Sequence, residues 1–173
     1  MSSIPAPYLL TLGLNSPTFE RLDALRARYF PPEWNQVPAH LMLFHQLPGE
    51  EWEAIDRAIA GVAASSPPVP LGFPVVKRIG RGMMLPAEAP GLAAIHASLA
   101  RTFDRWLTPQ DRQGFRPHVT LMNKSEPAKV AAAFGVLQAT WPGWTGLGDR
   151  LILYRYLGGP WDEVETYPLA GPR

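Results

Sequence analysis

Two short segments of the chain each place a histidine directly before an apolar run. Residues 38–44 read PAHLMLF and residues 116–122 read RPHVTLM, so His40 and His118 both stand close behind a proline. Breaking a phosphodiester bond needs one proton taken from the nucleophile and another given to the leaving oxygen. Histidine suits both roles because its ordinary pKa lies near neutrality. Two imidazoles brought to one cleft can therefore act as base and acid on the same phosphate.

The second segment carries further groups that could hold a phosphate. In a strand over residues 118–122, alternation places His118 and Thr120 on one face and the apolar residues on the other. The Thr120 hydroxyl can donate a hydrogen bond to a phosphate oxygen. If the extended backbone continues at both ends, Arg116 and Lys124 join the same face and offset the negative charge. This scheme requires no metal.

The first segment follows the same alternation but differs at one position. A strand over residues 39–44 points His40, Met42 and Phe44 toward the cleft and the two leucines between them inward. Met42 stands where Thr120 stands in the second segment, and a thioether is a weak acceptor and no donor. One lost hydrogen bond to a charged group costs roughly 1.5–3 kcal/mol, which is about one to two powers of ten in rate.

The elements around these segments repeat in order. The apolar patterns predict strands at residues 8–13, 39–44, 71–79, 118–122, 151–157 and 163–167, and helices at residues 16–28, 49–62, 89–107 and 127–137. Each half then reads strand, helix, strand with histidine, helix, strand. The duplication predicts an α+β fold with two pseudo-symmetric lobes, each an antiparallel sheet with helices packed outside. The two histidine strands would lie side by side in a central cleft.

Composition limits the class of protein. A chain of 173 residues with 46% hydrophobic residues can build a core, and its net charge of +1 gives little long-range attraction to nucleic acid. The absence of cysteine excludes disulfides and thiolate chemistry and fits a reducing compartment. The opening residues 1–7 resemble no leader, and no apolar stretch is long enough to span a membrane. We expect a cytoplasmic, unprocessed protein, with a monomer as the favoured state.

The histidine segments resemble the 2H phosphoesterase superfamily, which includes the 2′,5′-RNA ligases and the RNA 2′,3′-cyclic phosphodiesterases. That family carries an H-x-T or H-x-S motif in each lobe, and residues 115–121 (FRPHVTL) are similar to it, proline included. Residues 40–44 match in histidine and apolar context, with Met42 in place of the hydroxyl residue. The likeness in layout covers nearly the whole chain. It implies that His40 and His118 are acid and base and that Thr120 holds phosphate.

The resemblance also implies one bilobal domain over residues 1–173. By sequence its lobes are residues 1–66 and 67–173, with strands exchanged between them, and the proline-rich stretch 65–70 (SSPPVP) lies at their junction. We expect a phosphodiesterase, independent of metals and cofactors, that acts on a 2′,3′-cyclic phosphate or a 2′,5′ linkage. Its partners would be RNA ends or small nucleotides.

Other interpretations remain open at this point. Because of Met42, the chain could instead be a module that binds nucleotide or RNA phosphate with weak or no turnover. A third hypothesis is an interaction protein whose cleft is vestigial. A metal site is weakly supported, because no carboxylate or third histidine stands at ligand spacing beside either histidine.

Several further residues have both a functional and a structural interpretation. Arg78 and Arg81 could grip RNA phosphate at the cleft rim, although such charges usually only solvate a surface. Phe44, Tyr154 and Tyr156 could stack on a base, although we favour the core for all three; Phe44 faces the cleft only if the strand over residues 39–44 is regular. We expect structural roles for His45 and His96.

Overall fold

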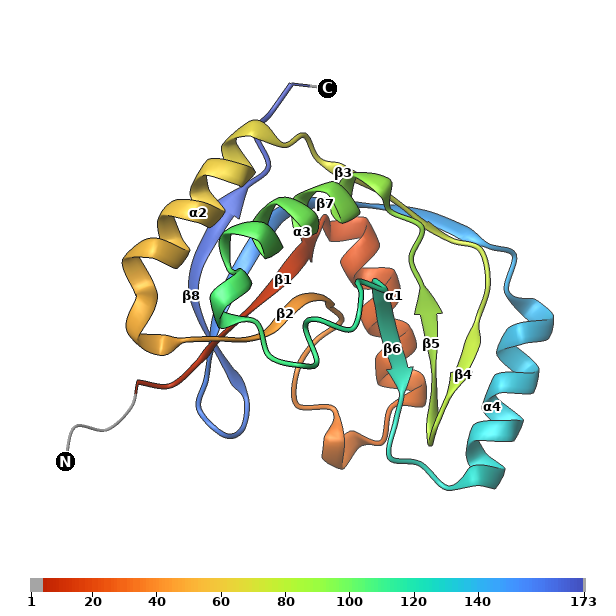
Figure 1. Cartoon of the computed structure of the whole chain (residues 1–173). Coiled ribbons are helices and arrows are strands. Elements are labelled where there is room, and N and C mark those ends of the chain that lie inside the picture. Colours follow the sequence, from red (N-terminus) through yellow and green to blue (C-terminus); the bar gives the residue numbers. More distant parts are fainter. Residues whose placement is uncertain (1–4, 173) are drawn as a thin grey trace.

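A computed structural model describes residues 5–172 as an α+β fold with two antiparallel sheets (Figure 1). Within those residues the larger sheet has five strands, β2 (Leu41–Leu47), β1 (Tyr8–Leu14), β7 (Trp144–Tyr156) and β3 (Val69–Phe73) in this order, with β8 (Trp161–Pro168) paired to β7. The smaller sheet has three, in the order β4 (Lys77–Ile79), β5 (Gly82–Pro86) and β6 (His118–Met122). The predicted class is confirmed, whereas the pseudo-twofold relation of two lobes stays a prediction.

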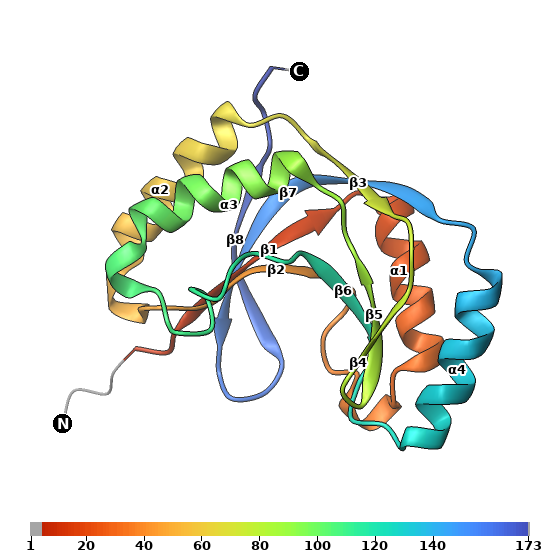
Figure 2. The ribbon, with the colours of Figure 1, turned by 45° about the vertical axis from the view of Figure 1, so that its right-hand side comes forward.

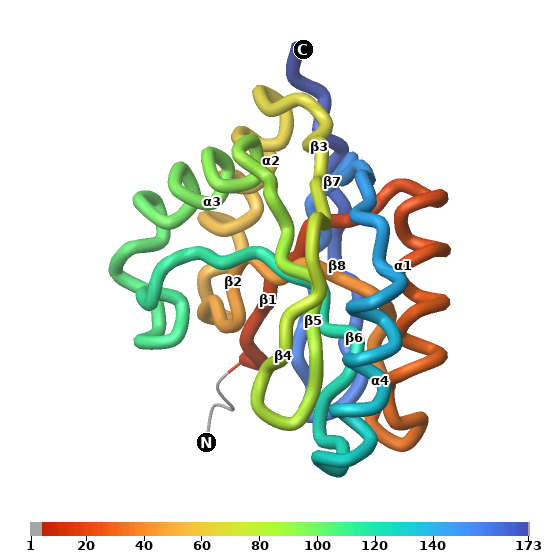
Figure 3. Tube along the Cα trace, turned by 90° about the vertical axis from the view of Figure 1, so that its right-hand side faces the viewer, coloured from red at the N-terminus to blue at the C-terminus, as the bar shows by residue number. Residues whose placement is uncertain are grey.

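Helices cover both sheets from outside. They are α1 (Ser16–Tyr29), α2 (Trp52–Ser65), α3 (Pro90–Thr102) and α4 (Pro127–Thr140). α2 and α3 pack on the larger sheet, and α1 and α4 pack on the smaller sheet at the other side of the molecule (Figure 3). Short 3-10 turns occupy Pro32–Trp34, Gly49–Glu51 and Asp104–Trp106. All four predicted helices are present, although the third ends at Thr102 because the 3-10 turn replaces its last residues.

Strand β7 occupies the middle of the larger sheet. Its second half pairs with β1 and β8, and its first half pairs with β3. The sequence predicted only residues 151–157 of this strand, because its first half lacks a clear apolar alternation. The sheet therefore joins strands from both sides of the proline-rich stretch. Of residues 1–7, which were predicted to form no leader, residues 1–4 lie outside the described part of the chain. No helix among residues 5–172 is long and apolar enough to cross a membrane.

The first histidine segment differs from the predicted strand. β2 begins at Leu41, so His40 lies immediately before the strand. Register shifts interrupt its pairing with β1, where Leu10 lies opposite Phe44 while the next residue, Thr11, lies opposite Met42. A bulge of this kind inserts an extra residue and turns the following side chains to the other face.

The bulge sends Phe44 into the core, so the prediction that this side chain faces the cleft is wrong. Leu43 is the extra residue of the bulge, and both it and Phe44 are buried. The Phe44 ring stacks on His96 at a centroid distance of 4.7 Å and meets Phe103 edge-on at 5.5 Å. His96 in turn stacks on Phe115 at 4.1 Å, so its imidazole packs between two aromatic rings.

The predicted extended run over residues 71–79 is two strands in different sheets. β3 ends at Phe73, and β4 begins at Lys77 and forms a hairpin with β5 through Gly80, whose φ is +33°. Gly82 then allows β5 to approach β6 closely, since an added Cβ would collide with the carbonyl oxygen of Met122. β6 itself matches the prediction for residues 118–122.

β2 and β6 belong to different sheets but lie side by side near the centre of the molecule (Figure 2). Arg26 of α1 is buried between β6 and the segment that precedes β2. Its guanidinium donates to the backbone oxygen of Thr120 at 2.6 Å, to Oδ1 of Asn35 at 2.9 Å and to the backbone oxygen of Val37 at 3.0 Å. Three acceptors from two distant segments thus share one cation.

A second residue of α1 reinforces this connection. Oδ1 of Asp23, one turn before Arg26, accepts a hydrogen bond from the backbone N–H of Ala39 at 2.9 Å. α1 therefore fixes the segment that leads into His40 and also the strand that begins at His118.

Replacing Arg26 with alanine should lower the free energy of unfolding by about 2–5 kcal/mol, because three oxygen atoms lose a charged donor at once. Urea titration followed by circular dichroism measures this loss. Arg28→Ala on the same helix is the matched control, since that side chain is exposed and stacks on the ring of Tyr29. It should change stability by less than about 0.5 kcal/mol. Similar losses in both variants would contradict the role given to Arg26.

Candidate active site

The imidazoles of His40 and His118 make the same hydrogen bond. Nδ1 of His40 lies 2.7 Å from the carbonyl oxygen of Pro38, and Nδ1 of His118 lies 2.8 Å from that of Arg116, so both contacts reach back two residues. A carbonyl oxygen can only accept, so each Nδ1 carries a proton and donates it. Each ring then has Nε2 left to exchange a proton with a ligand.

The surroundings of His40 keep its imidazole uncharged. Burial lowers the pKa of His40 to about 4, and the hydrogen bond to the Pro38 carbonyl only partly opposes this effect. The positive charges of Arg26, His118 and His45 lower the pKa further. The effect of His118 also puts the two imidazoles within electrostatic reach of each other. His40 is therefore neutral at physiological pH and able to accept a proton.

The residues predicted to hold phosphate occupy different settings. Thr120 is half-buried two positions along β6 from His118, and Arg116 is exposed and lines the same hollow as His118. β6 ends at Met122, and Lys124 has a φ of 54° with its Nζ over the ring of Trp34 at 4.1 Å. The extended backbone that would align Lys124 with His118 is thus not formed, because the chain turns after the strand.

A hollow of about 370 Å³ lies beside His118. Met42 lines it from β2, while Arg116 and His118 line it from the segment that enters β6. Met42 is half-buried and lies opposite Thr11 of β1. The side chain that replaces a hydroxyl residue in the first motif is thus a wall of the hollow that contains the second histidine.

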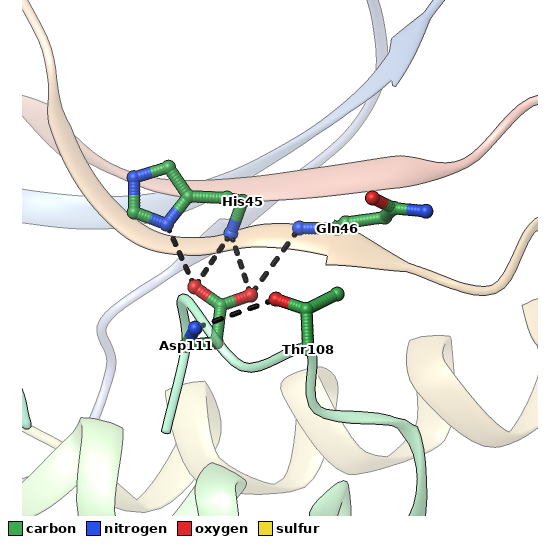
Figure 4. A network of polar contacts seen from close by, with 4 residues as sticks. All are labelled: His45, Gln46, Thr108 and Asp111. Carbon is green, nitrogen blue, oxygen red and sulfur yellow. Dashed lines mark hydrogen bonds and ion pairs between the residues drawn. The ribbon is translucent and has the colours of Figure 1, made fainter. Parts of the chain in front are cut away.

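His45 joins the loop before His118 to the edge of the larger sheet (Figure 4). The buried carboxylate of Asp111 accepts from the His45 ring at 2.7 Å, from the His45 backbone N–H at 3.0 and 3.1 Å, and from the Gln46 N–H at 3.4 Å. The Thr108 hydroxyl accepts from the Asp111 N–H at 3.3 Å. Burial opposes ionisation of Asp111, but its hydrogen bonds with His45 and Gln46 outweigh that effect and hold its pKa below the ordinary value.

This network supplies acceptors for N–H groups that a free sheet edge would leave unpaired, because β2 is the outermost strand. His45 also lines the hollow beside His118. The sequence predicted only a structural role for this residue.

A second, smaller hollow of about 220 Å³ lies beside His40. Trp161 meets the His40 ring edge-on at a centroid distance of 4.7 Å, and Tyr154 lies 5.5 Å from Trp161. Burial, and next the charge of Glu163, raise the pKa of Tyr154, whereas Arg150 opposes that shift. The Tyr154 hydroxyl therefore stays protonated and can donate a hydrogen bond.

Sequence reasoning missed Trp161 and Arg150 as site residues. The usable signal was the alternation along β7, which puts Arg150 and Tyr154 on one face, away from the main core, with the apolar Ile152 between them. Trp161 follows the Gly158–Gly159–Pro160 turn, and no local pattern relates that turn to His40, because the contact depends on how β8 folds back on β7.

The remaining candidates are peripheral. Arg81 donates from Nε to the backbone oxygen of Ser125 at 3.3 Å, and Arg78 is exposed on β4. Their proposed contact with RNA stays a prediction. In the described part of the chain, no three histidine, aspartate or glutamate side chains are grouped closely enough to hold a metal ion.

Comparisons with known proteins agree with this architecture. A family model described as the 2′-5′ RNA ligase superfamily matches residues 14–160. The structure of TT0787 from Thermus thermophilus has a TM-score of 0.69 and 20% identity, over 96% of this chain and 100% of that one. LigT of E. coli complexed with 3′-AMP has a TM-score of 0.64 and 19% identity, over 95% and 98%. At such identities the likeness shows the fold alone, and no curated protein matches the sequence.

The pKa of His40 can be measured directly. NMR titration of the imidazole nitrogens should show His40 taking up its second proton only as the pH falls to about 4, because burial disfavours the cation. A spectrum of His40→Asn assigns the resonance. A midpoint between about 6 and 7, the range of a solvent-exposed histidine, would show that the ring is not desolvated as described.

Proposed function

The chain belongs to the 2′-5′ RNA ligase superfamily, and from this membership we propose that it is a phosphodiesterase that uses two histidines and no metal. Its substrate would be a 2′,3′-cyclic phosphate or a 2′,5′ linkage in an RNA end or small nucleotide. The observation that carries the proposal is that His40 and His118 each donate from Nδ1 to the backbone carbonyl two residues earlier. Each ring is thereby left with Nε2 for proton exchange. LigT of E. coli, which has the same fold, was solved with 3′-AMP, ATP and NADP+.

The proposed reaction on a cyclic phosphate has a simple proton balance. The oxygen of water bonds to phosphorus while one bond from phosphorus to a ribose oxygen breaks. One imidazole, neutral and unprotonated at Nε2, takes the proton of the water, and the other, which must begin as the cation protonated at both nitrogens, gives its Nε2 proton to the leaving ribose oxygen. The carbonyl contacts at Nδ1 fix both the tautomer and the orientation of each ring, so little reorganisation is needed during the reaction.

Side chains beside His118 would bind the phosphate in this proposal. The Thr120 hydroxyl would donate to a nonbridging oxygen. The Arg116 guanidinium, which lines the hollow beside His118, would offset the negative charge of the phosphate. Lys124 would need to leave the Trp34 ring to contribute, so we give it a smaller part.

One observation favours a second function. Met42 lines the hollow at the position where the family has a hydroxyl residue, and its sulfur cannot donate to a phosphate oxygen. The alternative is a module that binds nucleotide or RNA phosphate with weak or no turnover. Calorimetric titration with a 2′,3′-cyclic nucleotide, followed by a long incubation and product analysis, separates the two functions.

Loss of either imidazole should remove the reaction. With a chelator present, His40→Ala and His118→Ala should each hydrolyse 2′,3′-cyclic nucleotides roughly 10²–10⁴-fold more slowly than the wild type. Urea titrations of both variants confirm that any loss does not come from unfolding. Equal rates for all three proteins would refute the acid and base assignment.

Restoring the hydroxyl should increase activity. Met42→Thr should raise the rate of hydrolysis by up to roughly one to two powers of ten, because the new O–H can donate to the phosphate in the transition state. Met42→Val is the matched control, since it has nearly the shape of threonine without the hydroxyl. A gain shared by both variants would attribute the effect to side-chain shape and not to the hydrogen bond.

A further inference from the structure

We propose that the hollow beside His40 binds the nucleobase of the substrate, with a purine preferred, and that Trp161 is the surface on which the base stacks. This inference rests on the proposed function, because the base would reach the hollow only when the phosphate of the same nucleotide is bound between the two histidines. It assigns a role to Trp161, Tyr154 and Arg150, which the reaction itself does not use.

Aromatic side chains form one wall of the hollow. Trp161 begins β8 and lies opposite Tyr156 in the ladder with β7, so its backbone is fixed by sheet pairing. Its ring is half-buried, contacts His40 edge-on and leans toward Tyr154. A base stacked on Trp161 would be separated from the His40 imidazole only by the indole ring. That spacing suits a nucleotide, in which a single ribose separates the base from the 2′,3′-phosphate.

The size of the hollow favours one ring system. Its volume of about 220 Å³ is below the roughly 300–1,000 Å³ of pockets that enclose whole drug-sized ligands. Leu12, Phe19 and Ile152 add apolar surface to the aromatic wall. A purine covers more of an indole face than a pyrimidine does, and stacking tolerates any base while favouring the larger one.

Polar groups meet the edge of the hollow and could bind the rim of a base. The Arg150 side chain crosses β1 at Gly13, where an added Cβ would lie 2.5 Å from its Cγ and 2.9 Å from its Nε. Glycine at this position thus makes room for the Arg150 side chain, whose Nη1 donates to Oδ1 of Asp149 at 2.5 Å. Across the hollow, Glu163 is held by a hydrogen bond from the Thr166 hydroxyl at 2.8 Å. The rim therefore offers both donors and acceptors.

The test compares substrates with and without a base. Wild type, Trp161→Ala and Trp161→Phe are assayed with the 2′,3′-cyclic phosphates of adenosine, guanosine and cytidine, and with methyl riboside 2,3-cyclic phosphate, which has no base. We expect Trp161→Ala to raise KM for the purine nucleotides roughly 5- to 150-fold, which corresponds to the usual value of one base stack. The abasic substrate should be affected less than about twofold, and Trp161→Phe should retain most of the affinity.

Controls separate stacking from support of His40. If Trp161 only positions the imidazole, Trp161→Ala will slow the abasic substrate as much as the nucleotides, and that result would overturn the proposal. Equal KM values for purine and abasic substrates in the wild type would also overturn it. Leu157→Ala, an exposed position in the turn before β8, should leave all four substrates unchanged.

Binding measurements distinguish a failed subsite from a failed function. Adenosine 3′-monophosphate and inorganic phosphate are titrated by calorimetry into wild type and Trp161→Ala. If no cyclic phosphate is hydrolysed but the nucleotide binds and Trp161→Ala weakens only the nucleotide, the base subsite stands and the phosphodiesterase proposal falls. If hydrolysis occurs and Trp161→Ala binds the nucleotide as tightly as the wild type does, the subsite falls and the phosphodiesterase proposal stands.

Discussion

The buried guanidinium of Arg26 is the contact on which the arrangement of the two histidines depends. β6 is the outermost strand of its sheet, and the carbonyl of Thr120 accepts a hydrogen bond from this cation. The same group binds the segment before His40 through Val37 and Asn35. A helix packed outside one sheet thereby sets the position of a segment that belongs to the other. Desolvating a cation is costly, and only acceptors on several sides make it stable there.

The edge of the larger sheet is stabilised by a negative charge. β2 is also outermost, and its free N–H groups at His45 and Gln46 donate to the buried carboxylate of Asp111. Two edge strands that lie side by side are thus each satisfied by side chains from outside their sheets, and not by pairing with one another. Among residues 5–172, no backbone hydrogen bond joins β2 to β6. Met42 of β2 and His118 of β6 both line the hollow that lies beside these strands.

Local patterns predicted the elements that follow regular alternation and failed where a distant contact decides. The strand at residues 118–122 and the helix that starts at Ser16 needed only apolar spacing and a capping residue. Phe44 was misplaced because a bulge depends on the partner strand, which the segment itself does not encode. Arg26 did leave a signal, since it stands on the apolar stripe of α1 four residues after Leu22, where a charge must find buried partners.

The central place of β7 has a consequence for how the chain is made. β1 is near the start of the sequence, yet it lies between β2 and a strand that begins at Trp144. A ribosome releases the chain from its N-terminus, so one edge of β1 stays unpaired until β7 has emerged. Pairing between strands so far apart in the sequence raises the contact order of the fold, which favours slow folding.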